Sequence, residues 1–119
     1  MTPAESRAFV EQALVKAGLR VLPQGSASPP SVFVAPGNDW ISAGQLAFGR
    51  AGINWVVVCV VSAANEVAAR DIDDLAYAVM SACKNLPPEW GLPEIGAPGV
   101  LTLAGLPYLA FRAEIQGVL

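Results

Sequence analysis

Apolar residues near the start of the chain recur at helical spacing, on one side of a predicted helix: Phe9, Val10, Ala13, Leu14 and Ala17. The residues before them are typical of a helix start. Thr2 suits the N-cap, Pro3 suits the first helical position, and Glu5 completes a capping box. Gly18 fits the left-handed residue that often ends a helix. We therefore predict a first helix between Thr2 and Gly18.

The middle of the chain has a different pattern. The segment Asn54–Ser62 is rich in β-branched residues, and its residues from Trp55 to Val61 lack polar side chains. Without an alternation of apolar and polar residues, such a strand is predicted to be buried on both faces.

A second amphipathic helix is predicted from about Asn65 to Leu86, because apolar residues recur there at intervals of three and four. Its first turns carry Asp71, Asp73 and Asp74, which favour the positive end of the helix dipole, and Lys84 comes late. The pair Pro87-Pro88 ends this helix.

The remaining segments read as shorter strands and turns. "LRVLP" and "VFVAP" (Val32–Pro36) are strand candidates, "GND" a turn, and the glycines between Trp40 and Gly52 favour strand ends and turns. After a Pro- and Gly-rich loop, "GVLTLAG" and "PYLAFRAEIQGV" predict a hairpin around Gly105, whose second strand alternates cleanly. The order of elements predicts one α+β domain over residues 1–119, with a two-layer, mostly antiparallel sheet and two helices on one face.

Composition narrows the class of protein. The chain is 54% hydrophobic and only 14% charged, against roughly 45–50% and about 25% in ordinary soluble domains. Its longest apolar run, Trp55–Ala64, is half of the roughly 20 residues that a membrane helix needs, and the N-terminus does not resemble a signal peptide. We therefore expect a soluble, intracellular protein. The net charge of −3 and the scattered basic residues disfavour nucleic-acid binding as a primary task.

Candidate catalytic chemistry is sparse. The sequence has no histidine, so Ser-His-Asp and Cys-His nucleophile systems are excluded. The acidic cluster at Asp71, Asp73 and Asp74 allows either a weak cation site or, as we favour, a solvated helix start. Cys59 and Cys83 lie in apolar patterns without metal spacing and are interpreted as buried, reduced thiols. Phosphate-loop motifs are absent. We expect no enzyme activity, cofactor or metal.

The doubly apolar strand raises the question of what covers its second face. Two helices of these lengths can cover one face of a small sheet. Either the loop Pro87–Pro98 or a neighbouring subunit is then expected on the other face, and the low charge favours self-association into a ring or dimer. Among the tryptophans, Trp55 is assigned to the core, whereas Trp40 and Trp90 are equally compatible with core and interface.

Three successive stretches also resemble a known family: "PPSVFVAP…DWI", "INWVVVCVVSAANEVAARDIDDLAYAV" and "PPEWGLPEIGAPGVLTLAGLPYLAFRAEI". Between about Pro30 and Ile115, the hydrophobic strand, the "ARDIDDLA" helix start and the "GAP" loop before a final hairpin are similar to the tail terminators and related head-to-tail neck proteins of long-tailed bacteriophages.

This resemblance implies a structural virion protein at the neck between tail and head, assembled in the host cytoplasm. Such subunits form a ring with copies of themselves, typically a hexamer, which caps the tail tube and meets the head connector or stopper protein. DNA passes through the lumen, and no membrane is involved. The family has no catalytic residues. Ring contacts are expected at exposed sheet and loop residues: Trp40, Arg50, Trp90, Arg112 and Glu114.

Three alternatives stay open at this point. Instead of a tail terminator, the sequence also allows another neck or completion protein. It allows a small non-enzymatic homo-oligomeric binding module, such as a chaperone-like or toxin-neutralising dimer. The third alternative is an enzyme with an all-carboxylate site.

Overall fold

In the computed structural model, residues 1–26, 28–42, 51–64 and 69–119 are described. The elements follow in this order: α1 (Pro3–Lys16), β1 (Ser31–Ser42), β2 (Gly52–Ala63), α2 (Ala69–Cys83), β3 (Glu94–Ile95), β4 (Gly99–Leu103) and β5 (Leu106–Val118). The predicted turns between residues 43 and 50, and the predicted helix start at residues 65–68, lie outside the described residues.

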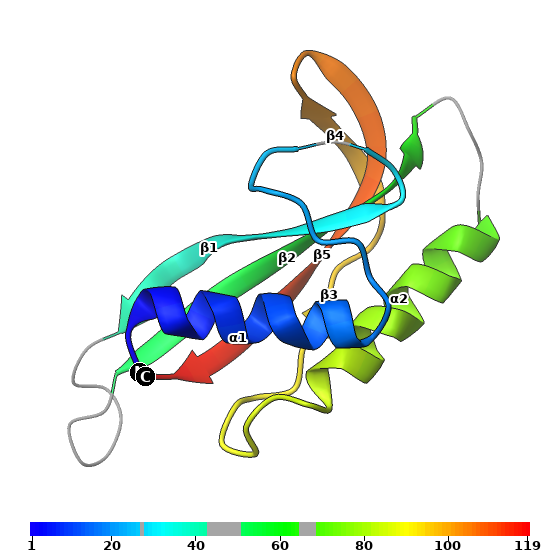
Figure 1. Cartoon of the computed structure of the whole chain (residues 1–119). Coiled ribbons are helices and arrows are strands. Elements are labelled where there is room, and N and C mark those ends of the chain that lie inside the picture. Colours follow the sequence, from blue (N-terminus) through cyan, green and yellow to red (C-terminus); the bar gives the residue numbers. More distant parts are fainter. Residues whose placement is uncertain (27, 43–50, 65–68) are drawn as a thin grey trace.

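The strands form one antiparallel sheet in which β2 is central. The order is β1-β2-β5, and both β3 and β4 pair with the outer edge of β5. The two helices lie on the same face of this sheet (Figure 1). The structure therefore confirms the predicted α+β class with its two layers.

Both ends of α1 are formed by the residues that the sequence indicated. The Thr2 hydroxyl accepts a hydrogen bond from the Glu5 amide (3.1 Å), and the Glu5 carboxylate accepts one from the Thr2 amide (3.4 Å). Gly18 has a φ of +85°, a conformation that costs a glycine little. On the buried side of α1, the Ser6 hydroxyl accepts a hydrogen bond of 2.9 Å from the indole Nε1 of Trp55.

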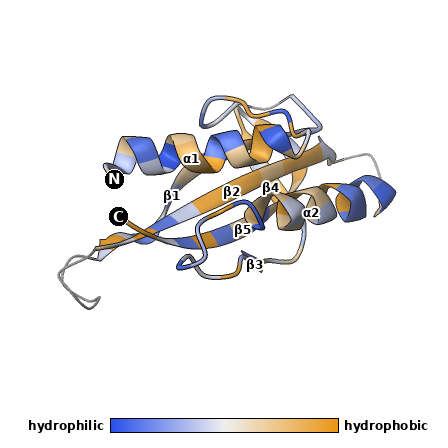
Figure 2. Cartoon of the chain, turned by 60° about the horizontal axis from the view of Figure 1, so that its bottom comes forward, coloured by the Kyte–Doolittle hydropathy of each residue, from blue (hydrophilic) through white to orange (hydrophobic). Residues whose placement is uncertain are grey.

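The main core lies between the helices and the sheet. One side of β2 contributes Ile53, Trp55, Val57 and Cys59, which pack against a set of buried helix residues: Val10, Leu14, Leu75, Val79 and Ala82. Trp55 is 1% exposed, as predicted. Figure 2 shows that most of β2 is hydrophobic and that this strand runs beside the two helices.

β1 differs from its prediction because it continues through the predicted "GND" turn. The strand runs to Ser42, and its register against β2 shifts between Pro36 and Ile41. The Asn54 side chain donates hydrogen bonds to the main-chain carbonyls of Asn38 (3.3 Å) and Asp39 (2.9 Å). Asp39, with a φ of 50°, therefore belongs to a bulge stabilised from the neighbouring strand rather than to a chain reversal.

The segment "LRVLP" was predicted as a strand but forms only an isolated parallel bridge between Val21 and Val32. Its main-chain hydrogen bonds to β1 involve a single residue of that strand: the Val32 amide donates to the Arg20 carbonyl, and the Val32 carbonyl accepts from the Leu22 amide.

The second face of the sheet is covered in part by the chain's own final hairpin. Phe33, Val58 and Val60 are buried on this face, and a set of hairpin side chains packs against them: Leu101, Leu103 and Tyr108. The predicted cover, the loop Pro87–Pro98, instead contributes Trp90 and Ile95 to the helix-side core. Of the two expected covers, the loop was therefore wrong, because the hairpin bends out of the plane of its neighbours and packs on this face (Figure 1). Cover by a neighbouring subunit stays a prediction.

A close contact between Trp90 and Gly117 gives the first prediction. A Cβ atom added at Gly117 would lie 3.0 Å from the indole ring of Trp90, whereas one added at Gly99 meets no atom within 4 Å. We expect Gly117→Ala to lower the free energy of unfolding by about 1–3 kcal/mol through overpacking. Gly99→Ala, the matched control, is expected to change it by less than about 0.5 kcal/mol. Urea denaturation measures both, and equal effects would contradict the close packing of Trp90.

Candidate interaction surfaces

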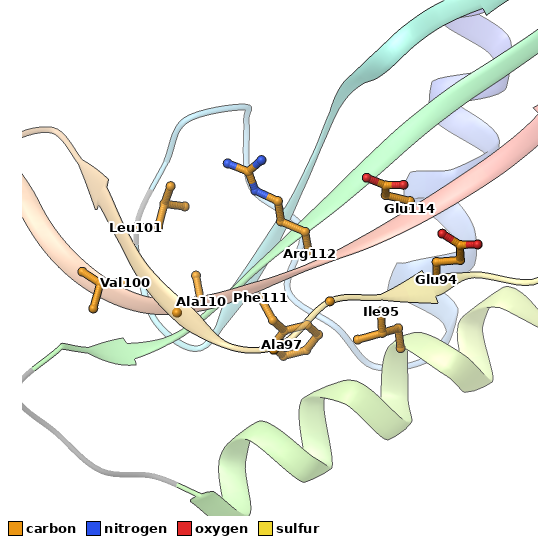
Figure 3. A pocket seen from close by; sticks show the side chains of 11 residues that line it. Glu94, Ile95, Ala97, Val100, Leu101, Ala110, Phe111, Arg112 and Glu114 are labelled. Carbon is orange, nitrogen blue, oxygen red and sulfur yellow. The ribbon is translucent and has the colours of Figure 1, made fainter.

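The part of the second face that the hairpin leaves uncovered carries a short charged row. Side chains of β5 alternate, so Arg112 and Glu114 lie on this face, while Phe111 is buried on the helix side. β3 places Glu94 directly opposite Glu114. Figure 3 shows these three charged side chains on one side of the sheet, with Phe111 and Ile95 directed toward α2. The depression beside them has a volume of about 520 Å³ and extends between β3 and β4.

The pairing of Glu94 with Glu114 is electrostatically unfavourable within the subunit. Like charges placed directly opposite each other on antiparallel strands destabilise the pair. Among the described residues, Glu94, Glu114 and Arg112 make no ion pair within 4 Å and no side-chain hydrogen bond. This row can therefore bind oppositely charged groups of a partner without first breaking internal bonds.

Apolar side chains are exposed on several sides of the molecule. Ten large hydrophobic residues of the described chain are more than one third exposed: Met1, Phe9, Val15, Trp40, Ile41, Tyr77, Met80, Leu92, Val100 and Leu106. The most exposed is Leu92, at 91%. It lies on a groove of about 560 Å³ between the end of α2 and the following loop, beside Met80 and Leu86.

The five predicted interface residues lie in different environments. Arg112 and Glu114 are exposed and lie together on the open face, as described above. Trp40 is partly exposed near the end of β1, with its ring edge-on to Trp55 at 5.7 Å between centroids. Trp90 is only 7% exposed and packs against Phe9 and Gly117, so the core alternative holds for this side chain in the subunit. Arg50 lies outside the described residues.

Several exposed residues were not singled out from the sequence. Glu94 belongs to a strand of only two residues, too short for any periodicity to reveal. Leu92 and Val100 are apolar residues in Pro- and Gly-rich surroundings, and only the tertiary arrangement shows that nothing in the described chain covers them. The one available signal was the low total charge, which indicated excess apolar surface but not its location.

The thiols are unsuited to nucleophilic chemistry. Burial, with a smaller contribution from nearby Cys83, raises the pKa of the Cys59 thiol to about 12, and burial raises the pKa of Cys83 to about 11. Both groups are therefore protonated at neutral pH, and the thiolate is the reactive form. Cys59 and Cys83 are not joined by a disulfide.

Two further features are absent from the described ranges. No three histidine, cysteine, aspartate or glutamate side chains there gather closely enough to hold a metal ion. Neither of the described helices is long and apolar enough to cross a membrane. The candidate surfaces of the described chain are the charged row, the groove beside Leu92 and the exposed hairpin.

The sequence matches no protein-family model and no curated protein.

Proposed function

We propose that this protein is a structural assembly subunit of the tail-terminator type: it forms a ring on the end of a phage tail tube and joins it to the head connector or stopper. The observation that carries the proposal is the exposure of large apolar side chains on separate parts of a small subunit. Contiguous apolar surface marks contacts with other proteins, and Leu92 belongs to such a surface because it lies in one groove with Met80 and Leu86. The resemblance of Pro30–Ile115 to tail terminators supplies the identity of the assembly.

The distribution of these side chains favours a ring over a pair that meets through one patch. Val15 lies on the outer side of α1, Leu92 follows α2, and Val100 and Leu106 lie on the hairpin. A two-fold dimer uses the same patch on both subunits, whereas a ring needs two different patches on each subunit. Several apolar patches on different elements therefore suit a ring, which in the resembling family is typically a hexamer.

The charge of the subunit is compatible with a lumen through which DNA passes. The net charge is −3, and the seven basic residues are scattered through the sequence. A strongly basic channel would bind the phosphates of DNA and hold it, because neutralised phosphates release counterions. A weakly acidic subunit avoids that obstacle to passage.

The proposal is tested with the charged row. Arg112→Glu places a third carboxylate on the face that already carries Glu94 and Glu114, and should weaken assembly on tail tubes at least tenfold. The fold should persist because Arg112 is exposed. Arg70→Glu, an exposed residue of α2, makes the same charge change away from this row and serves as the control.

The measurement uses a phage tail-tube protein, which the proposal expects to be encoded in the same genome as this chain. Polymerising tubes are mixed with wild-type protein, Arg112→Glu or Arg70→Glu, and tube lengths and end-bound rings are counted by electron microscopy. Wild-type protein and Arg70→Glu should cap the tubes. Uncapped tubes with wild-type protein would contradict the proposed function, and equal capping by Arg112→Glu would remove this residue from the contacts.

A further inference from the structure

The outer edge of β4 lacks the features that usually prevent sheet edges from pairing with other chains. β4 pairs with β5 on one side, and no other described strand pairs with it. Its sequence, Gly-Val-Leu-Thr-Leu, has neither charge nor proline. Natural edge strands are normally protected by charges, prolines or bulges. The edge strand on the opposite side of the sheet, β1, has such protection in Pro36 and in the bulge at Asp39.

The backbone groups that β4 offers follow from its hairpin. Ala104 and Gly105, both with positive φ, form a two-residue turn, so Leu103 and Leu106 are a hydrogen-bonded pair. Because hydrogen-bonded and non-hydrogen-bonded pairs alternate, Leu101 also bonds to β5. Val100 and Thr102 therefore direct their N–H and C=O groups away from the sheet, which gives four unpaired groups on the outer edge.

The outer edge of β1 offers a matching set. Val32 already uses both of its outward groups, in bonds of 2.9 Å to the Arg20 carbonyl and 2.8 Å to the Leu22 amide. By the same alternation, the next outward residues are Val34 and Pro36. The register shift follows Pro36 and ends the regular strand. Val34 and Pro36 thus have the same spacing along the edge as Val100 and Thr102. They offer three outward groups, the N–H and C=O of Val34 and the C=O of Pro36, because proline has no N–H.

Strand directions allow these two edges to meet between copies in the same orientation. Successive antiparallel pairings across β1-β2-β5-β4 make β1 and β4 antiparallel to each other. We infer that, in the ring of the proposed function on which this inference rests, β4 of one subunit pairs antiparallel with β1 of the next copy. Thr102 then lies opposite Val34 and Val100 opposite Pro36, with three main-chain hydrogen bonds.

Side chains on the helix side of the sheet support the same contact. Val100 is 70% exposed and pairs with Leu109, so it lies on the helix side of the hairpin. Next to β1 on that side, a hollow of about 530 Å³ is lined by Ala8, Glu11 and Val15 of α1 and by Val21. Continuing the sheet into the next copy keeps the faces in register, so Val100 and Thr102 would cover this hollow.

Site-specific disulfide formation tests the pairing. Two proteins, Val100→Cys and Pro36→Cys, are each made with Cys83→Ser, assembled on tail tubes and oxidised with diamide. The mixture should yield a covalent dimer and neither protein alone should do so. The double variant, with both cysteines in one chain, should yield a ladder of bands that ends at the closed ring.

A second pair of variants tests the energetic role of the edge. Val100→Lys adds a charge to the outer edge of β4 and should raise the protein concentration needed for ring formation at least tenfold. Tyr77→Lys on α2, where the side chain is also 70% exposed, is the matched control and should leave it unchanged.

The possible results separate this inference from the proposed function. Rings that form normally with Val100→Lys and give no disulfide between positions 100 and 36 overturn the edge pairing and leave the proposed function standing. A disulfide between Val100→Cys and Thr102→Cys proteins, but not with Pro36→Cys, indicates two-fold pairing of β4 and also overturns it. Absence of rings with wild-type protein overturns both.

Discussion

Trp55→Ala is expected to lower the free energy of unfolding by about 3–5 kcal/mol, the range for removing a buried large aromatic side chain. Trp55 is almost fully buried near the start of β2. Its indole donates a hydrogen bond to Ser6, the Arg7 guanidinium lies 4.9 Å from the ring centroid, and the Trp40 ring packs against it at an interplanar angle of 68°. The substitution therefore leaves a cavity where α1 meets the sheet and removes the partner of a buried hydroxyl.

A double-mutant cycle separates the hydrogen bond from the packing. Ser6→Ala alone should cost about 1–3 kcal/mol, because the buried indole N–H is left without an acceptor. In a Trp55→Phe background that N–H is absent, so the same change at Ser6 should cost clearly less. Urea denaturation gives all four free energies. An undiminished cost of Ser6→Ala in the Trp55→Phe background would show that the Ser6–Trp55 bond does not stabilise the fold.

Phe33→Ala should have the next largest effect, also about 3–5 kcal/mol. Phe33 lies on the face opposite the helices, where Leu101, Leu103 and Tyr108 of the hairpin cover it. If the hairpin closes this face within the single subunit, the loss appears in dilute, monomeric protein. Leu106→Ala, at an exposed position of the same hairpin, is the control and should cost less than about 0.5 kcal/mol.

The outcome for Phe33 decides how the second face is covered. A cost below about 1 kcal/mol in the monomer, rising only on assembly, would mean that a neighbouring subunit and not the hairpin buries Phe33. Measuring thermal unfolding across a range of protein concentrations distinguishes these cases, because coverage by a partner makes the transition concentration-dependent.

Elements set by local sequence could be predicted well. The capping box of Thr2 and Glu5, the left-handed Gly18 after the end of α1 and the alternation of β5 depend on residues close together in the chain, and each is present as expected. The bulge in β1 could not be predicted, because it depends on the side chain of Asn54, which lies on another strand. Nor could the packing of the final hairpin over Phe33, which brings together strands far apart in the sequence.

The sequence predicted the chemical character of the candidate surfaces but not all of the residues that form them. Alternation placed Arg112 and Glu114 on the open side of β5, and the low charge indicated surplus apolar surface. The unfavourable pairing of Glu94 with Glu114 depends on which strand lies beside β5, and a strand of two residues leaves no pattern in the sequence. Trp90 was ambiguous because a tryptophan in a loop packs inward or outward according to what lies opposite, which here is Gly117.

The most direct test is the mass and form of what the protein assembles into when it meets polymerising tail-tube protein, measured by mass photometry and electron microscopy. We expect closed rings of roughly six 12.3 kDa subunits on the tube ends, since contacts between unlike patches close by rotation. Capped tubes should stop growing. A protein that stays monomeric, or forms a two-fold dimer, while the tubes continue to grow would contradict ring assembly.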